Sequence, residues 1–221
     1  MTDFISPSPA NSSKKGRLIS FEGIDGSGKS SQLHLCAQAL EKAGHAVLIT
    51  RNPGGTAFGQ TLRNMLLHPT SKPVFPMAEL LLFVADRAQH LQEVILPALD
   101  AGMMVLCDRY TDSTVAYQGH GRGLDLTTID TLNQIATQGH APDLTLLFDG
   151  EPLALAQRIR ERGASDRMER EKLDFHERVR QGYLTLARQH PQRIQVFNAL
   201  DSMAGLSHQV QTCLNQKLGF A

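Results

Sequence analysis

The sequence has no excess of charge of either sign: Lys and Arg together number 22, Asp and Glu together number 22, and the formal net charge is zero. Proteins dedicated to nucleic acids or anionic membrane surfaces draw much of their affinity from excess positive charge. The charge balance therefore argues against both classes, and we expect neither a nucleic-acid partner nor a membrane partner. It still allows a small anionic ligand held by a few arginines.

Cysteine is scarce as well. Cys36, Cys107 and Cys213 are far apart and form no Cys-x-x-Cys pair, and the nine histidines show no metal-ligand spacing. This odd, scattered set excludes a disulfide framework and a zinc site, and it favours a reducing interior. We expect a cytoplasmic protein. No apolar run approaches the roughly 18 residues that would suggest a membrane span.

The chain of 221 residues is 41% hydrophobic, enough to bury one sizeable core. Residues 1–16 are rich in Ser and Pro without a long apolar segment, so we expect a mobile tail rather than a signal peptide. With no internal repeat and no second composition regime, residues 17–221 are expected to form a single domain.

Apolar runs that favour strands alternate with segments of helical spacing. The runs lie at 17–22, 46–50, 103–107, 144–148 and 193–197; helical patterns cover roughly 29–43, 58–67, 77–99, 125–138, 151–162, 175–187 and 202–218. Alternation of this kind predicts an α/β fold with a five-stranded parallel sheet and helices on both faces. Ligands of such sheets bind outside the carboxyl ends of the strands.

The segment after the first run matches the Walker A pattern Gly23-x-x-x-x-Gly28-Lys29-Ser30, with an expected strand before it and a helix after it. Glycines there let backbone N–H groups turn toward phosphate oxygens, and the helix N-terminus adds positive potential. Lys29 is expected to reach the β and γ oxygens and Ser30 to ligate Mg²⁺. The predicted ATP loop comprises Gly23, Asp25, Gly26, Ser27, Gly28, Lys29, Ser30 and Ser31.

Five strings then occur in one order along the chain: FEGIDGSGKSSQ, TRNPGGT, LLFVADRAQH, DRYTDSTVAYQGHGR and SDRMEREKLDFHERVRQGY. In order and spacing they resemble bacterial thymidylate kinases, from about Arg17 to the final helix. The resemblance implies a three-layer P-loop kinase fold with a short lid at about 158–171. It also implies a homodimeric, Mg²⁺-dependent enzyme that moves the ATP γ-phosphoryl group onto dTMP, giving dTDP and ADP for dTTP synthesis.

Polar residues that follow the second and third runs are candidates for holding the acceptor phosphate. The Arg51 fork can reach a phosphate at the sheet edge, and the resemblance assigns it the acceptor's phosphate. Asp108 can orient magnesium-bound water, and Arg109 can neutralise the acceptor phosphate during transfer. A structural Asp–Arg pair is the simpler alternative, and it is more credible for Asp108 than for Arg109.

Other residues are assigned to the nucleoside part of the acceptor mainly by the resemblance. Phe83 and Arg87 are one helical turn apart, so they share a face that suits a flat base; the family's matching pair contacts thymine. By resemblance Asp25 contacts the sugar 3′-hydroxyl or its magnesium-bound water. In the loop expected after Tyr110, Ser113 supplies a polar group, Thr114 and Gln118 lie near the base, and Tyr117 packs under the sugar.

Arginines of the charged segment 160–171 would otherwise be ordinary surface residues paired along a helix. The resemblance places Arg158, Arg162 and Arg167 in a lid that closes over the phosphates. Because the phosphate loop has Gly26-Ser27 where some relatives carry a basic residue, we expect a lid arginine to act in cis. Arg162 and Arg167 are the favoured candidates, and Arg158 is the third.

Two residues depart from the family pattern: Asn52, where Glu is usual, and Asn198, where an Asp commonly follows the last strand near the donor's adenine. An amide at 52 disfavours a nucleoside acceptor, whose hydroxyl needs a carboxylate base. A monophosphate is already ionised near pH 7 and needs none. The alternatives left open are a non-catalytic nucleotide-binding module and a kinase for another nucleoside or nucleotide.

Overall fold

The computed structural model describes residues 16–68, 74–163 and 166–219, with only the backbone of Arg162. The expected N-terminal tail, 1–16, lies outside the described residues except for Gly16. No helix within the described ranges is long and apolar enough to cross a membrane.

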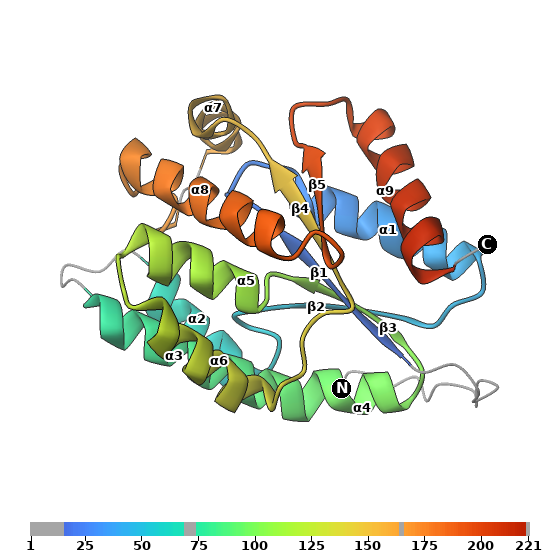
Figure 1. The fold of residues 1–221 in the computed structure, drawn as a ribbon, viewed down its shortest axis with the longest axis horizontal. Helices are drawn as coiled ribbons and strands as arrows, with labels where there is room; N and C mark the ends of the chain where they lie inside the picture. Colours follow the sequence, from blue (N-terminus) through green and yellow to red (C-terminus); the bar gives the residue numbers. More distant parts are fainter. Residues whose placement is uncertain (1–15, 69–73, 164–165, 220–221) are drawn as a thin grey trace.

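A parallel sheet of five strands forms the centre of the molecule in the order β2-β3-β1-β4-β5 (Figure 1). The strands are β1 (Arg17–Glu22), β2 (Val47–Arg51), β3 (Met104–Asp108), β4 (Leu144–Asp149) and β5 (Ile194–Asn198). β1, β3 and β4 are almost wholly buried, which explains why the sequence shows them as continuous apolar runs. The predicted α/β fold is confirmed.

Helices cover both faces of the sheet (Figure 1). On one face α1 (Lys29–Lys42) packs against α9 (Met203–Leu218). On the other lie α8 (Leu173–Gln189), α5 (Thr111–Thr114) with its π-helical continuation (Val115–Gly121), and α3 (Pro76–His90) with its extension through 91–100. The remaining helices are α2 (Ala57–Leu67), α6 (Leu126–Thr137) and α7 (Pro152–Arg162).

The long helix expected at 77–99 is continuous but not uniform. After α3 it passes through a π-helical stretch, Leu91–Ile95, and ends as α4, Leu96–Asp100. Pro97 has no N–H to donate to the preceding turn, so the regular α-helical bonding cannot continue unchanged there. Apolar side chains of this stretch, among them Leu91 and Ile95, pack against Leu18 and Val105 of the sheet.

The sequence predicts a loop after Tyr110, whereas residues 111–121 are helical in the structure. Polar residues and two glycines hide the apolar periodicity of this segment, and it packs closely on α8. Gly121 meets the side chains of Phe175 and Val179, where an added Cβ would lie 2.7–3.0 Å from them. Contact with α8, rather than local propensity, explains the helical conformation.

Candidate functional site

Strand register brings the predicted site residues to one edge of the sheet. Arg51 and Phe21 both pair with Asp108, so the ends of β2, β3 and β1 lie side by side. The phosphate loop therefore begins next to Arg51 and Asp108. This is the carboxyl edge, where parallel sheets bind ligands.

The phosphate loop requires glycine at two positions for different reasons. Gly23 has φ 136°, and a Cβ there would overlap the carbonyl oxygen of Phe148. Gly28 has open space around it but adopts a left-handed conformation, φ 82°, at the start of α1. Lys29 follows immediately: it is buried, its Nζ donates to the Ile24 carbonyl at 3.3 Å and lies 3.7 Å from Asp25.

A cavity of about 730 Å³ opens over this loop. Its positive side chains come from five separate segments: Lys29, Arg51, Arg63, Arg109 and Arg158. Such a concentration of positive charge suits a polyphosphate. From the phosphate loop itself, the lining comprises Asp25, Gly26, Gly28, Lys29, Ser30 and Ser31. Gly23 and Ser27 are not part of this lining, and the buried Ser27 Oγ has no partner among the described atoms.

Two oxygen groups in this cavity fit a magnesium site. Ser30 Oγ donates to Asp108 Oδ2 at 2.9 Å, and both residues line the cavity. Oxygen donors of this kind are the ones Mg²⁺ uses, together with substrate phosphates and water. In the described part of the chain no group of three or more His, Cys, Asp or Glu could hold a metal ion. Most ligands of a Mg²⁺ ion here would therefore come from nucleotide and water.

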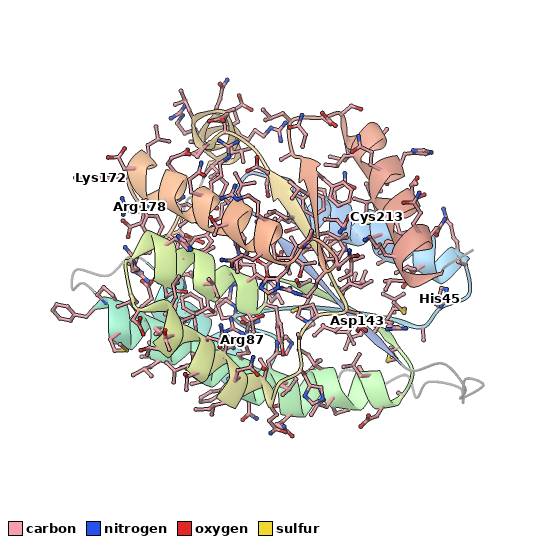
Figure 2. All side chains as sticks on the ribbon, viewed as in Figure 1. His45, Arg87, Asp143, Lys172, Arg178 and Cys213 are labelled. Carbon is pink, nitrogen blue, oxygen red and sulfur yellow. The ribbon has the colours of Figure 1, made fainter. Side chains whose placement is uncertain are left out.

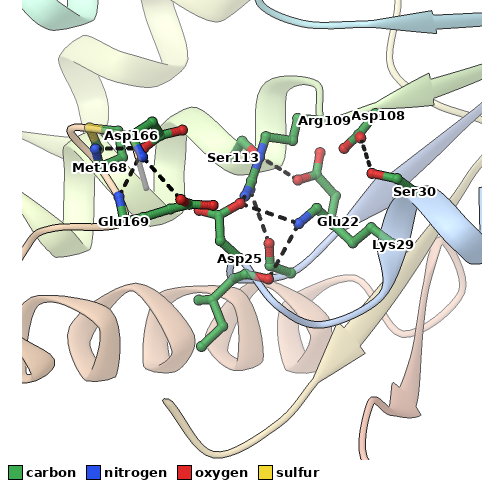
Figure 3. Close-up of polar contacts among 12 residues, drawn as sticks. Glu22, Asp25, Lys29, Ser30, Asp108, Arg109, Ser113, Asp166, Met168 and Glu169 are labelled. Atoms are coloured by element: carbon green, nitrogen blue, oxygen red, sulfur yellow. Dashed lines mark hydrogen bonds and ion pairs between the residues drawn. The ribbon is translucent and has the colours of Figure 1, made fainter. Parts of the chain in front are cut away.

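Arg109 lies at the centre of the site (Figure 3). Its guanidinium donates to Asp25 at 2.7 Å, to the Gly23 carbonyl at 3.0 Å, and to the hydroxyls of Ser113, Tyr117 and Tyr183 at 3.1–3.2 Å. Its backbone adopts φ 71°, a left-handed conformation that is unfavourable for a residue with a Cβ. These contacts hold the side chain in one orientation.

The charges around Arg109 stabilise one another. Burial by itself lowers the pKa of Arg109, but Asp25, Tyr117 and Tyr183 beside it raise that pKa well above its ordinary value. Burial likewise raises the pKa of Asp25, yet Arg109 and Lys29 hold it well below its usual range. Both groups are charged at neutral pH, so the site contains a fixed ion pair.

A smaller cavity adjoins the first and is lined by the residues predicted for the acceptor nucleoside. These are Asp25, Phe83, Arg87, Arg109, Ser113, Thr114, Tyr117 and Gln118. Asp25, Asn52 and Arg109 line both cavities. Two ligands, one in each cavity, would thus meet at Arg109.

Arg87, labelled in Figure 2, is buried and lines this smaller cavity. It donates to Asn133 at 2.8 Å, to Asn52 Oδ1 at 2.7 Å and to the Tyr110 carbonyl at 3.0 Å. Its Nε has no hydrogen-bond partner among the described residues. A buried donor without a partner is costly, and Arg87 is one of the residues that line the smaller cavity.

Asn52, the first departure from the family pattern, joins two charged residues of α3. Its amide nitrogen donates to Asp86 Oδ2, while its oxygen accepts from Arg87. A carboxylate at this position could accept from Arg87 but would repel Asp86. Burial raises the pKa of Asp86. The Asn52 amide therefore both donates to Asp86 and accepts from Arg87, which an ionised Glu could not do here.

Arg63 is a residue of this site that the sequence does not single out. It extends from α2 into both cavities, and its guanidinium donates to the Pro53 carbonyl at 2.9 Å. Burial, and then repulsion from Arg51, lower its pKa. The helical pattern of α2 shows only that Arg63 precedes the buried Leu66. The signal that could have found it is a second Arg shortly after the turn that carries Arg51.

The three arginines predicted for the lid differ in their positions relative to the two cavities. Arg158 lines the larger cavity and donates to the Ala199 carbonyl at 2.9 Å. Arg162 ends α7, and its side chain lies outside the described atoms. Arg167 is not among the described residues that line either cavity; it donates to the Leu66 carbonyl and, at 2.6 Å, to the buried Glu79. Glu79 holds the Arg167 guanidinium in this structure, and the role of Arg167 at the phosphates stays a prediction.

Asn198, the second departure, lies at the end of β5 and bonds locally. Its amide nitrogen donates to Asp201 at 2.7 Å, and its oxygen accepts from the Leu200 N–H at 3.1 Å. It thus shapes the turn between β5 and α9. Among the described residues it lines neither of the two cavities.

Comparison with known proteins agrees with this geometry. The sequence model of the family described as thymidylate kinase matches residues 21–210. The thymidylate kinase of Syntrophotalea carbinolica is 51% identical over 87% of this chain and 92% of its own, and that of Citrifermentans bemidjiense is 49% identical over 92% and 93%. The crystal structure of thymidylate kinase from Ehrlichia chaffeensis superposes with a TM-score of 0.75 at 33% identity, covering 90% of this chain and 98% of that one.

Proposed function

The chain belongs to the thymidylate kinase family and phosphorylates dTMP with ATP, and we propose how its residues divide that reaction. The observation that supports this division is that the phosphate-loop cavity and a smaller cavity meet at Arg109. Sequence similarity to the thymidylate kinases described above favours this function over a non-catalytic nucleotide-binding module.

The larger cavity is the ATP site in this proposal. Backbone N–H groups of the loop from Gly23 to Ser31 and the N-terminus of α1 hold the phosphates. Lys29 reaches the β and γ oxygens, and Arg158 contributes charge from α7. Ser30, and Asp108 through water, would hold Mg²⁺, which when bound neutralises charge on the transferring phosphoryl group.

The acceptor phosphate is held where the cavities join, by Arg51, Arg63 and Arg109. Three guanidinium groups facing one small volume repel one another, and a dianionic phosphate relieves that repulsion. The lowered pKa of Arg63, caused by burial and by Arg51, supports this assignment. We propose that these arginines hold the attacking oxygen in line with the γ-phosphorus.

The nucleoside part of dTMP occupies the smaller cavity. Phe83 stacks on the base, Arg87 donates to a base carbonyl, and Thr114 and Gln118 lie at its edge. Tyr117, fixed by hydrogen bonds with Asp25 and Arg109, packs under the sugar where a 2′-hydroxyl would clash. Asp25 faces the 3′ side of the sugar. The Ser113 hydroxyl accepts a hydrogen bond from Arg109 and so helps to orient that arginine.

The chemistry requires no general base. The dTMP oxygen is already ionised near pH 7, so transfer depends on alignment and charge neutralisation. Once the bond from the acceptor oxygen to the γ-phosphorus forms, the bond to the β-bridging oxygen breaks. ADP leaves with the electron pair. Arg109, with its orientation fixed by five contacts, neutralises charge without having to reorganise.

A panel of acceptors combined with Lys29→Ala tests these assignments. ADP release should be fastest with dTMP and far slower with CMP, AMP, GMP or thymidine. The Lys29→Ala variant should lose at least a hundredfold in kcat, while calorimetry shows that dTMP binding largely survives. Equal turnover of all monophosphates, or loss of dTMP binding with Lys29, would contradict the division between the two cavities.

A homodimer is supported by exposed apolar side chains on adjacent helices. α2 packs on α3 and α3 packs on α6, and their outer faces expose Phe58, Met65, Met77, Leu81 and Ile135. A patch of this kind marks a protein interface more often than a free surface. We place the enzyme in the cytoplasm, in keeping with its three unpaired thiols.

A further inference from the structure

Glu79 is a fully buried carboxylate that the reaction as described does not use. It lies in the first turn of α3 and contacts Gln118, which lines the smaller cavity. Gln118 Nε2 donates to its Oε1 at 2.9 Å, Arg122 donates to both of its oxygens at 3.1 Å, and Arg167 donates to Oε2 at 2.6 Å. One carboxylate thus joins the base-side residue Gln118 to two arginines.

Glu79 is ionised despite its burial. Burial raises its pKa, but hydrogen bonds from Arg122 and Gln118 and the charges of the arginines outweigh burial, and the net shift is downward. An ionised carboxylate can only accept hydrogen bonds. Gln118 must therefore present its amide nitrogen to Glu79. The oxygen and nitrogen of a Gln amide are similar in size, so its shape alone does not fix which one faces Glu79. The ionised carboxylate does fix it.

The remaining group of Gln118 is its carbonyl oxygen, an acceptor. Gln118 lines the smaller cavity, and within the described part of the chain no hydrogen bond involves its Oε1. The same cavity contains Arg87, whose buried Nε–H is a donor without a described partner. Beside the Thr114 hydroxyl, which can donate or accept, the wall therefore offers one fixed acceptor, Gln118 Oε1, and one fixed donor, Arg87.

The acceptor on Gln118 and the donor on Arg87 are complementary to the hydrogen-bonding groups of thymine but not to those of cytosine. Thymine presents a donor, N3–H, beside an acceptor, O4. Cytosine presents an acceptor, N3, beside an amino donor. If the Gln118 amide were reversed, its nitrogen would face N3 and would suit cytosine at that atom. Selection against cytosine therefore depends on what fixes the amide.

We propose that Glu79 is a positioning residue for base selection: it orients the Gln118 amide so that the cavity accepts the N3–H of thymine and rejects cytosine. The inference rests on the acceptor site proposed above. It assigns Glu79 no contact with substrate.

Glu79→Gln tests the proposal, because the new amide can donate as well as accept and no longer dictates the orientation of Gln118. We expect the ratio of kcat/KM for dTMP over dCMP to fall roughly tenfold. The ratio for dTMP over dUMP, bases that differ only at the 5-methyl group, should stay within about twofold. A merely structural loosening of the pocket would change both ratios, and an unchanged dCMP ratio would overturn the proposal.

Glu171→Gln is the matched control. Glu171 pairs with Arg122 at 2.7 Å but has no described contact with Gln118, so both ratios should be unaffected. In Gln118→Met the dTMP over dCMP ratio should already be low, and adding Glu79→Gln should lower it no further. Additive effects would mean that Glu79 acts by another route. A wild-type enzyme with no preference for dTMP over dCMP would instead contradict the proposed acceptor site.

A measurement on the unmodified enzyme remains decisive if Glu79→Gln does not fold. The side-chain amide of Gln118 can be assigned in a ¹⁵N correlation spectrum by its loss in Gln118→Met. Bound to Glu79, its two protons should stay protected and nearly unshifted when dTMP is added. A large ¹⁵N shift on binding would show that the nitrogen faces the base, and the proposal would be wrong.

Discussion

Arg109 shows how a single residue depends on its surroundings. Its neighbours on the chain explain only its place at the end of β3. Its orientation comes from Asp25, Tyr117 and Tyr183, which lie on the phosphate loop and on two other helical segments. Tyr183 also donates to the buried Glu22 at 2.9 Å. The arginine proposed to neutralise the transferring charge is thus held in part by Tyr183, to which we assign no contact with substrate.

Tyr183→Phe should lower kcat by roughly tenfold while changing the KM for dTMP less, because Arg109 loses an acceptor and becomes less well oriented. Steady-state kinetics would measure this. Tyr110→Phe is the control, since among the described residues the Tyr110 hydroxyl donates only to the His140 carbonyl, at 3.3 Å. Each change removes one tyrosine hydroxyl and should cost on the order of 1 kcal/mol of stability. Equal kinetics in the two variants would argue against a positioning role for Tyr183.

Among the elements, α3 has an unusual buried face. Glu79, Asp86, Arg87 and His90 all lie on it and are almost inaccessible. Each has a partner on another segment: His90 Nε2 pairs with Thr50 Oγ1 at 2.6 Å, and Asp86 accepts from Gly54. The helix therefore holds the turn after β2 in place. Its polar stripe is part of the site's scaffold rather than a solvated surface.

Gly55→Ala tests this contact between the turn and α3. A Cβ at Gly55 would overlap the His90 ring and lie 2.8 Å from Thr50 Oγ1, so we expect a loss of about 1–3 kcal/mol in unfolding free energy. The KM for dTMP should rise because Arg51 lies on the same segment. Urea unfolding and kinetics would measure both. Gly205→Ala, at an exposed position of α9, should be neutral or slightly stabilising. If it lowered the unfolding free energy as much as Gly55→Ala does, overlap with His90 would not explain the Gly55→Ala effect.

The stability of the whole molecule should depend on His90 at mildly acidic pH. Burial, and then repulsion from Arg87, lower its pKa to about 4, below the ordinary value of about 6.5. A group whose folded-state pKa is depressed stabilises the protein above its unfolded-state pKa and loses this contribution as pH falls. The loss begins below about pH 6.5 and continues toward pH 4.

Unfolding free energies of the wild type and His90→Gln, compared at pH 7.5 and 5, would test this dependence. The wild type should lose about 2 kcal/mol more than the variant over this interval. Burial raises the pKa of Asp86, so its effect on the unfolding free energy changes with pH in the opposite direction. Because this effect is present in both proteins, it cancels when their unfolding free energies are compared. Replacement of the exposed His34 by Gln should leave the profile unchanged. Parallel profiles for wild type and His90→Gln would contradict the prediction.

Assembly of the molecule is tested by Leu81→Asp. Leu81 is 48% exposed on α3, in the centre of the proposed dimer patch. A charge there should shift sedimentation from dimer toward monomer, because it places an unpaired carboxylate in an apolar interface. Val196→Asp changes an equally exposed side chain, 49%, on β5 at the far edge of the sheet. It should leave the dimer intact; a monomeric wild type would show that no such interface exists.

Some features of this protein follow from its sequence alone. The phosphate loop could be located because its glycines and Lys29 lie close together in the chain and their geometry is local. The five strands were visible because buried parallel strands are continuous apolar runs. The helical segment 111–121 was not visible, since its conformation depends on packing against α8.

Only the tertiary structure decided which groups meet. Arg63 and Arg109 come from distant segments, and nothing in local sequence indicates that they line the same cavity. Arg167 lies in the predicted lid segment, yet Glu79, 88 residues away in the chain, holds it. A buried carboxylate must find a cation wherever the fold supplies one. The sequence determined the elements and the loop that binds phosphate, while long-range pairing of buried charges decided how the acceptor site is built.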